Sequence, residues 1–238
     1  MKLFDLYKYV KFVLGCIAIL FISFSSHSQD YLLDTSERKT MTRIGITSSL
    51  LFGTSFLMDE PIQNSIKNNR SNYLDDFTNY ANYGGNKKLV LPLNAILLGS
   101  SYLFNDEYLK TTSRNAFKSI GTAALVTEFL KLSLSRARPY KQQGPYHFNP
   151  ISWRNNSYKS LPSGHTSLAF AFITPYAEEY SRWLYVIPVS VAFSRVYKND
   201  HWTSDVILGS IIGFTAGYFF HYKDRHITVS FNKIVVRF

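Results

Sequence analysis

Apolar residues along the chain gather into long runs separated by polar segments. After a polar stretch over residues 31–42, six apolar runs follow, over residues 44–58, 89–104, 116–134, 168–177, 183–196 and 206–220. Their length and spacing predict six helices. Most runs are shorter than the roughly 20 apolar residues that a bilayer-spanning helix needs, although 89–104 and 206–220 carry no charge. We therefore predict an all-α fold, a bundle of about six helices that either forms a soluble core or spans a membrane at a tilt.

The segments between the runs are long. Residues 59–88 are rich in Asn, Asp and Tyr, which predicts a connection with room for one amphipathic helix. Residues 140–160 form a second long loop that contains Gly144-Pro145 and several aromatic residues, and long ordered loops in compact domains are often functional. The tail over residues 226–238 alternates apolar and polar positions. This alternation predicts a short strand-like tail, either a hairpin or a surface segment.

The amino terminus has the three regions of a secretory signal peptide. Lys2, Lys8 and Lys11 precede an apolar run over residues 12–24, and small polar residues follow up to Ser28. We predict a signal peptide over residues 1–28, a helical domain over 29–225 and the tail over 226–238, with export to the cell envelope. An uncleaved membrane anchor is the alternative. The single cysteine, Cys16, excludes intrachain disulfides and cysteine-based metal cages.

Composition narrows the classes of function. The chain has 238 residues, of which 46% are hydrophobic and 18% charged, which excludes a disordered or collagen-like protein. The formal net charge of +10 fits nucleic acid, an anionic membrane surface or a phosphorylated ligand. Neither a run of basic residues nor a nucleic-acid-binding motif is present, so we expect no nucleic-acid partner.

The first cluster of chemically able residues covers residues 131–139 and has the sequence KLSLSRARP. On a continuing helix, Lys131, Ser135 and Arg138 would share one face. Pro139 would end that helix and leave the Arg138 guanidinium on its last turn. Two cations beside an apolar segment suggest an anion site. The alternative is a helix end whose cations complement the macrodipole.

The second cluster covers residues 161–167 and has the sequence LPSGHTS. Ser163 suits an N-cap, Gly164 allows a ligand to approach the backbone, and His165 would lie in the first turn of a helix. Helix N-termini favour phosphate-like anions, and a histidine there can donate a proton to a leaving group. The alternative is an ordinary capped helix with a surface histidine.

The third cluster covers residues 194–205 and has the sequence SRVYKNDHWTSD. His201 and Asp205 are four residues apart, so in a helix the carboxylate can hydrogen-bond the imidazole and leave its other nitrogen free to attack. Arg195 adds a guanidinium that can bind two phosphate oxygens. The alternatives are a structural His/Asp pair, or Asp200 as the partner of His201.

Together the clusters read K-x6-RP, PSGH and SR-x5-H-x3-D, in that order. This pattern resembles the signature of the type 2 phosphatidic acid phosphatase and vanadium haloperoxidase superfamily. The positions that match are Lys131, Arg138, Pro139, Pro162, Ser163, Gly164, His165, Ser194, Arg195, His201 and Asp205.

The resemblance implies an acid phosphatase/haloperoxidase-like helical bundle and a role for each matched residue. His201 would attack phosphorus to form a phosphohistidine, Asp205 would orient it, and His165 would protonate the leaving oxygen. The phosphoryl oxygens would be bound by Lys131, Arg138, Ser163, Gly164 and Arg195. The resemblance implies no metal and no other cofactor, and the sequence has no cluster of carboxylates and histidines spaced for a two-metal site.

Within the superfamily, we expect a lipid phosphate phosphatase on the outer face of the cytoplasmic membrane, with a phosphorylated lipid as its substrate. A soluble exported acid phosphatase acting on small phosphate esters is the alternative. A vanadium haloperoxidase would use the same anion pocket, but such enzymes are usually larger. A non-catalytic phosphate or lipid binder would have no use for a nucleophile. The sequence does not name the lipid or the oligomeric state.

Overall fold

The structure is a computed structural model that describes residues 35–149, 154–230 and 233–236. The predicted signal peptide over residues 1–28 lies outside the described residues. The chain divides into two compact units, residues 1–54 with residue 238, and residues 55–237. The described part of the first unit, residues 35–54, forms all but the last residue of helix α2 (Thr35–Ser55). This helix contains most of the first predicted run.

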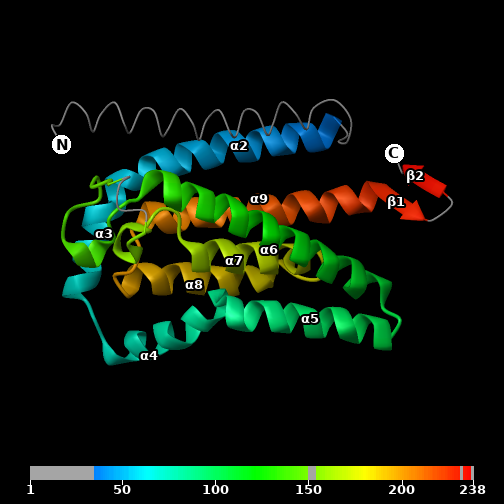
Figure 1. Cartoon of the computed structure of the whole chain (residues 1–238), viewed down its shortest axis with the longest axis horizontal. Helices are drawn as coiled ribbons and strands as arrows, with labels where there is room; N and C mark the ends of the chain where they lie inside the picture. The colour runs from blue at the N-terminus through cyan, green and yellow to red at the C-terminus, as the bar shows by residue number, and fades with distance from the viewer. Residues whose placement is uncertain (1–34, 150–153, 231–232, 237–238) are drawn as a thin grey trace. The chain divides into compact units, whose positions relative to one another are not determined.

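The second unit contains the remaining helices, and the predicted helical bundle is confirmed (Figure 1). The five predicted runs from 89–104 onward correspond to α5 (Lys87–Leu103), α6 (Glu107–Leu134), α7 (Gly164–Glu179), α8 (Val186–Tyr197) and α9 (Thr203–His226). A 3-10 turn, Arg182–Tyr185, leads into α8. The apolar runs thus mark the helices, while the bounds extend into flanking polar residues.

The segment over residues 59–88 differs from the prediction, because it forms two helices where we expected at most one. They are α3 (Asp59–Asn68) and α4 (Asn72–Ala81). At the start of α4 the Ser71 hydroxyl accepts a hydrogen bond from the Leu74 amide. Ser71 is therefore the N-cap of a new helix, which separates α4 from α3. On α3 the buried side chains are Asp59 and Gln63, one turn apart. Polar residues on a buried face conceal a helix from a hydrophobic pattern.

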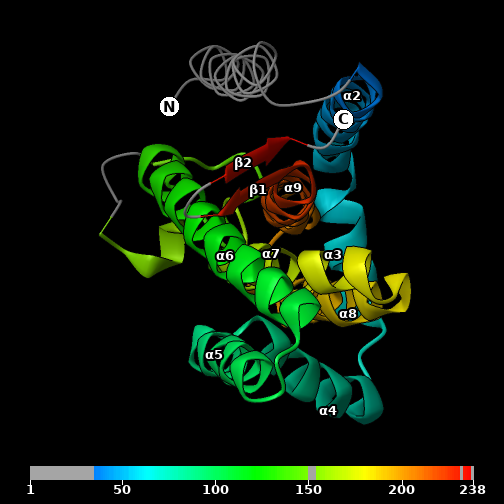
Figure 2. The same cartoon turned by 90° about the vertical axis from the view of Figure 1, so that its right-hand side faces the viewer.

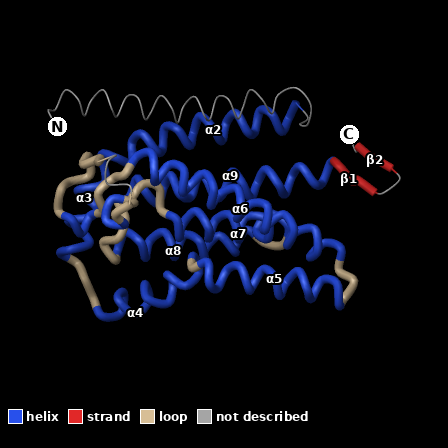
Figure 3. The backbone as a smooth tube through the Cα atoms, in the orientation of Figure 1, coloured by secondary structure: helices blue, strands red, loops and turns tan. Residues whose placement is uncertain are grey.

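Helices α5 to α9 alternate in direction along the bundle (Figure 1). The end of α6, the start of α7, the end of α8 and the start of α9 therefore meet at one end of the bundle. Figure 3 shows most of the loops gathered at this end, beside α3. The described parts of the connection between α6 and α7, residues 135–149 and 154–163, lie there as well. The topology thus brings the three sequence clusters to one place.

Helix α7 lies at the centre of the bundle and contacts α5, α6, α8 and α9 (Figure 2). It packs closely against α9 because glycines face it. A Cβ on Gly209 would lie 2.6 Å from the Ser163 oxygen, and one on Gly213 would lie 2.3 Å from the Ser167 oxygen. This close approach positions the starts of α7 and α9 against each other.

The tail forms a hairpin, in the segment where alternation predicted strands. Strand β1 (Ile227–Ser230) pairs antiparallel with β2 (Lys233–Val236), with Ile227 opposite Val236. It follows α9 directly. Within the described residues one helical segment, Thr203–Lys223, is long and apolar enough to cross a membrane, and 56% of it is buried inside the protein. A buried core helix of a soluble protein has the same properties.

Candidate active site

The three sequence clusters are joined by hydrogen bonds between their segments. The Trp202 indole donates to the Ala137 oxygen at 2.9 Å, which links the third cluster to the first. The Ser163 amide donates to the Asp205 oxygen at 2.9 Å, which links the second to the third. Residues far apart in the sequence therefore share one site at the end of the bundle.

The first cluster departs from the predicted continuous helix. Helix α6 ends at Leu134, and Ser135 has a left-handed backbone with φ of 45°. Arg136 then forms an isolated β-bridge with Phe148. The loop over residues 140–160 supplies backbone partners that replace helical ones, so the predicted shared helical face of Lys131 and Arg138 is wrong. Lys131 lies in the last turn of α6, and Arg138 lies beyond it.

Two guanidinium groups of the site are held together by Asp200. Arg195 lies 3.0 Å from the Asp200 carboxylate, and Arg138 lies 3.9 Å from it. Arg195 also donates to the Asn82 side-chain oxygen at 2.6 Å. Asp200 thus pairs with arginine and is not the partner of His201. The Arg195 Nε is buried and has no hydrogen-bond partner among the described residues, so the site keeps a donor for an anionic ligand.

The start of α7 is arranged around Gly164. Ser163 occupies the N-cap position as predicted, but its hydroxyl pairs with the Thr166 hydroxyl at 2.9 Å and makes no capping bond. A Cβ on Gly164 would lie 2.9 Å from the Lys131 ammonium nitrogen. The glycine therefore lets Lys131 reach the first turn of α7, which also carries the half-buried His165.

Burial is the main cause that lowers the pKa of His165 to about 4, and the nearby cations of Arg195, Lys131 and Arg138 contribute to the same shift. Burial also lowers the pKa of Lys131, although the neighbouring Glu128 opposes this. With this pKa, the imidazole of His165 is neutral at neutral pH. An anion bound among the same cations would offset their charge and raise the pKa of His165.

His201 is 1% exposed, and its Nδ1 lies 2.7 Å from the main-chain oxygen of Ser160. A carbonyl oxygen can only accept, so Nδ1 carries the hydrogen and Nε2 carries the lone pair. The Asp205 carboxylate lies 3.6 Å from Nδ1. The direct hydrogen bond that a helical pair would make is absent because His201 precedes α9 instead of lying within it. Burial lowers the pKa of His201 to about 3.

Asp205 occupies the first turn of α9 and is fully buried. One carboxylate oxygen accepts the Ser160 hydroxyl at 2.5 Å and the Trp202 amide at 2.8 Å. The other accepts Arg136 at 2.6 Å. Asp205 therefore acts on the imidazole through its charge and through Ser160, whose carbonyl binds the ring.

Sequence reasoning missed Arg136, which is fully buried. Its guanidinium donates to Asp205 at 2.6 Å, to Asp59 at 2.7 Å and to the Pro145 oxygen at 2.7 Å. The available signal was a third charged residue inside the first cluster. The motif leaves that position unspecified, and Asp59 lies far outside the motifs in sequence.

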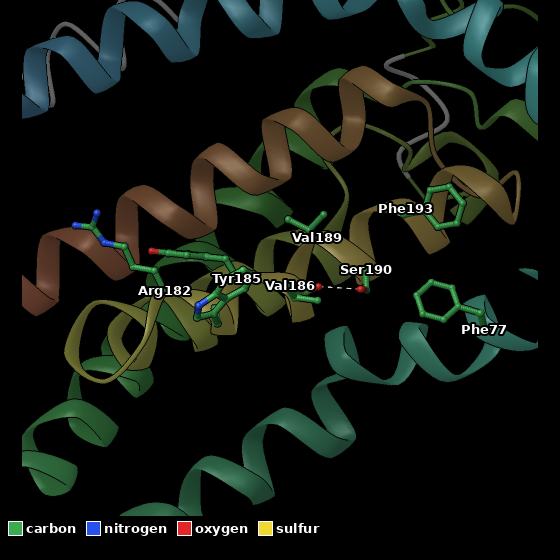
Figure 4. Close-up of a pocket in the computed structure, with 8 residues that line it drawn as sticks. Phe77, Arg182, Tyr185, Val186, Val189, Ser190 and Phe193 are labelled. Carbon is green, nitrogen blue, oxygen red and sulfur yellow. Dashed lines mark hydrogen bonds between the residues drawn. The ribbon is translucent and has the colours of Figure 1, made fainter.

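A separate apolar groove lies between α4 and α8, with a volume of about 490 Å³ (Figure 4). Phe77 lies on one side, and Val189 and Phe193 lie on the other. Its lining consists of Phe77, Arg182, Trp183, Tyr185, Val186, Val189, Ser190 and Phe193. None of the motif residues lines it.

The charges around the three clusters favour an anion. Three basic side chains, Lys131, Arg138 and Arg195, surround His165 closely enough to lower its pKa. No group of three or more His, Cys, Asp or Glu residues that could hold a metal occurs in the part of the chain that the structure describes. The site as built thus suits a phosphate-like ligand.

Part of the chain matches the sequence profile of a known protein family. Residues 114–227, which include all three clusters, match the sequence profile of the PAP2 superfamily. Over these residues the chain is similar to the PAP2 superfamily. The matched PAP2 region begins within α6 and ends at the first residue of the hairpin, so α3, α4 and α5 lie outside it.

Curated relatives match parts of the chain. A lipid A 1-phosphatase of Porphyromonas gingivalis is 38% identical over 81 residues, which cover 31% of this chain and 18% of that protein. A lipid A 1-phosphatase of Rhizobium etli is 28% identical over 111 residues, which cover 44% of this chain and 47% of that protein. The matched parts thus span less than half the length of these relatives.

Two solved structures share the fold of the PAP2 region and of further helices in this chain. Aquifex aeolicus LpxE has a TM-score of 0.55 at 22% identity, covering 68% of this chain and 94% of that chain. The first transmembrane PAP2 type phosphatidylglycerolphosphate phosphatase from Bacillus subtilis has a TM-score of 0.59 at 20% identity, covering 79% and 98%. The similarity extends beyond the motifs to most of the helical bundle.

Proposed function

We propose that this protein is a metal-independent phosphatase that removes phosphate from membrane lipids through a phosphohistidine intermediate. The observation that carries the proposal is the tautomer of His201. Its Nδ1 donates to the Ser160 oxygen, so Nε2 holds the free lone pair that a nucleophile requires. The neighbouring Arg195 keeps an unpartnered Nε for a phosphoryl oxygen.

In the first step, Nε2 of His201 attacks phosphorus and the bond from phosphorus to the leaving oxygen breaks. His165, protonated once the dianionic substrate offsets the surrounding cations, donates its proton to that oxygen. The imidazole of His201 becomes positively charged. The Asp205 carboxylate, 3.6 Å from Nδ1, stabilises that charge, and Lys131, Arg138 and Arg195 stabilise the phosphoryl oxygens.

In the second step, water attacks the phosphohistidine. His165, neutral after the first step, takes the proton from the water, and the bond from phosphorus to Nε2 breaks. Inorganic phosphate leaves and the neutral imidazole of His201 is restored. Ser163 and Gly164 shape the first turn of α7, where the backbone amides favour the transferred group.

A lipid substrate is supported by the outer surface of the helices. Leu89, Ile96 and Leu103 on α5 are between 47% and 82% exposed, and the apolar groove beside α8 adds a hollow of about 490 Å³. Large exposed apolar surfaces are typical of membrane or lipid contact. The relatives named lipid A 1-phosphatase support a phosphorylated lipid of the cell envelope. We accordingly propose export and membrane association on the periplasmic side.

The second candidate is a soluble exported acid phosphatase acting on small phosphate esters. It is favoured by the modest length of the apolar runs and by the 56% burial of Thr203–Lys223 inside the protein. The chemistry at His201 and His165 would be the same. The two candidates differ in the substrate and in where the protein fractionates.

The test is phosphate release by the full chain in EDTA, from lipid A, phosphatidate, an isoprenyl diphosphate and a water-soluble aryl phosphate, with vanadate as inhibitor. We expect activity that EDTA spares and vanadate blocks, with a lipid preferred. His201→Ala should abolish it and should prevent trapping of a phosphoenzyme that is stable to alkali and labile to acid.

The matched control is Arg70→Gln, which removes an exposed ion pair with Asp75 and leaves the site intact. This variant should retain wild-type activity. Preference for the aryl phosphate would favour the soluble candidate. Folded wild type without activity on any phosphate, or full activity in His201→Ala, would overturn the proposal.

A further inference from the structure

A buried ion network adjoins His201 through Asp205. Arg136 bridges two carboxylates, with 2.6 Å to Asp205 and 2.7 Å to Asp59, and all three side chains are fully buried. Asp59 also accepts the Ser204 amide at 2.8 Å and the Ser204 hydroxyl at 2.7 Å. Asp59 therefore binds both the guanidinium and the first turn of the helix that carries Asp205.

Helix α3 also contacts the turn that carries His201 at a second residue, Asn199. One helical turn after Asp59, Gln63 donates to the Asn199 side-chain oxygen at 2.6 Å. Asn199 has a left-handed backbone with φ of 62° and lies two residues before His201. A helix outside the PAP2 region thus contacts both sides of this histidine in the sequence.

The charges of the network have a consequence for the reaction. Attack by Nε2 leaves a positive imidazole, which the nearby Asp205 stabilises. A guanidinium bonded to Asp205 on its own would cancel that negative charge. Asp59 on the other side of Arg136 restores a net negative charge to the group, because two carboxylates then share one cation.

We propose that Asp59 and Arg136 are positioning residues for the phosphatase reaction, which fix the Asp205 carboxylate and keep its negative charge available to the His201 imidazole. This inference rests on the proposed function. It assigns a role in the reaction to α3, which precedes the PAP2 region.

The experiment compares full-length wild type with Asp59→Asn, Arg136→Lys and Ser204→Ala. It measures kcat and KM per folded molecule, together with inhibition by vanadate and by inorganic phosphate. Vanadate mimics the state in which His201 is bonded to the phosphoryl group, whereas phosphate reports the cation pocket alone. We expect kcat to fall about tenfold or more in Asp59→Asn and Arg136→Lys, with KM changed by less than about threefold.

Vanadate inhibition should weaken by a factor similar to the loss of kcat, while phosphate inhibition stays within about threefold of wild type. Ser204→Ala should show the same pattern with a smaller effect, because it removes one hydroxyl and no charge. Tyr176→Phe is the matched control. It deletes a buried hydroxyl bonded to Ser113 and Asn94 in the same bundle and should lower stability without changing kcat per folded molecule.

Two results would overturn this inference while leaving the proposed function in place. One is an active wild type whose Asp59→Asn and Arg136→Lys variants keep kcat and vanadate inhibition per folded molecule. The other is loss of folded protein in all three variants, which would assign the network to stability alone. An inactive wild type that does not bind vanadate would overturn the proposed function and this inference with it.

Discussion

Ser160 contacts both His201 and Asp205, the former through its main-chain oxygen at 2.7 Å and the latter through its hydroxyl at 2.5 Å. One residue thereby sets the tautomer of His201, the proposed nucleophile, and links it to the carboxylate. The Asp205 carboxylate itself lies 3.6 Å from the ring nitrogen. The orientation of the imidazole is therefore determined by the backbone as well as by the acidic residue.

This arrangement predicts unequal effects for two substitutions. Ser160→Ala keeps the carbonyl and removes one hydroxyl, so kcat should fall by about 3- to 10-fold, the value of one hydrogen bond. Asp205→Asn removes the charge that stabilises the positive imidazole, and kcat should fall by about 100-fold or more. Steady-state kinetics and thermal unfolding on the same samples check this. Parallel losses of activity and stability in Asp205→Asn would indicate a structural role instead.

Arg195→Lys should not behave as a conservative change. The guanidinium bonds Asn82 and Asp200 and still has Nε available, whereas an ammonium cannot make these contacts in one plane. We expect a cost of about 1.5 to 3 kcal/mol in transition-state stabilisation, the range for charged hydrogen bonds. This corresponds to a fall in kcat/KM of roughly 10- to 150-fold. Arg70→Lys at an exposed ion pair serves as control, and unchanged kcat/KM in Arg195→Lys would remove Arg195 from the site.

Two glycines predict opposite outcomes on adding a methyl group. In Gly164→Ala the new Cβ meets the far end of the Lys131 side chain at 2.9 Å, so the flexible ammonium should move away and phosphate inhibition should weaken with little loss of stability. In Gly209→Ala the Cβ meets the Ser163 backbone at 2.6 Å. Overpacking there should lower the free energy of unfolding by about 1 to 3 kcal/mol.

Gly99→Ala is the control for both variants, because nothing lies within 4 Å of its new Cβ. It should be neutral or stabilising by about 0.5 to 1 kcal/mol, as expected in a helix interior. Denaturant unfolding and phosphate inhibition measure the two effects separately. Loss of stability in Gly164→Ala equal to that in Gly209→Ala would contradict the prediction.

The two site histidines predict how stability depends on pH. Burial lowers the pKa of His165 to about 4 and that of His201 to about 3, from an ordinary value of 6.5. Between these values and 6.5 the unfolded chain binds protons that the folded chain does not. Their contribution to stability is therefore fully present above pH 6.5. It is lost progressively as the pH falls from 6.5 towards 4 and then 3.

Urea unfolding at a series of pH values tests this expectation. The free energy of unfolding of the wild type should fall with decreasing pH below 6.5. His165→Gln and His201→Gln should each make that dependence shallower, because glutamine does not titrate. An unchanged slope in both variants would show that other groups carry the pH dependence.

Much of the fold followed from local pattern. The apolar runs marked five helices of the second unit and most of α2, because a helix that buries one face needs a run of apolar residues. The alternation after residue 226 marked the hairpin. Helices α3 and α4 were not separated, since Asp59 and Gln63 are polar yet buried. Their burial is stabilised by partners more than 75 residues away in the sequence, and no local pattern contains such partners.

The sequence by itself determined which residues are candidates for the chemistry, because the residue types and spacings around Lys131, His165 and His201 mark three clusters whatever the fold. Only the tertiary structure decided how they act together. It ended α6 before Arg136 and paired Asp200 with Arg138 and Arg195. It also placed the Ser160 carbonyl within hydrogen-bond distance of the His201 ring. The physical reason is that hydrogen bonds between buried groups are selected by the packing of distant segments, and their competition is settled only when the bundle closes.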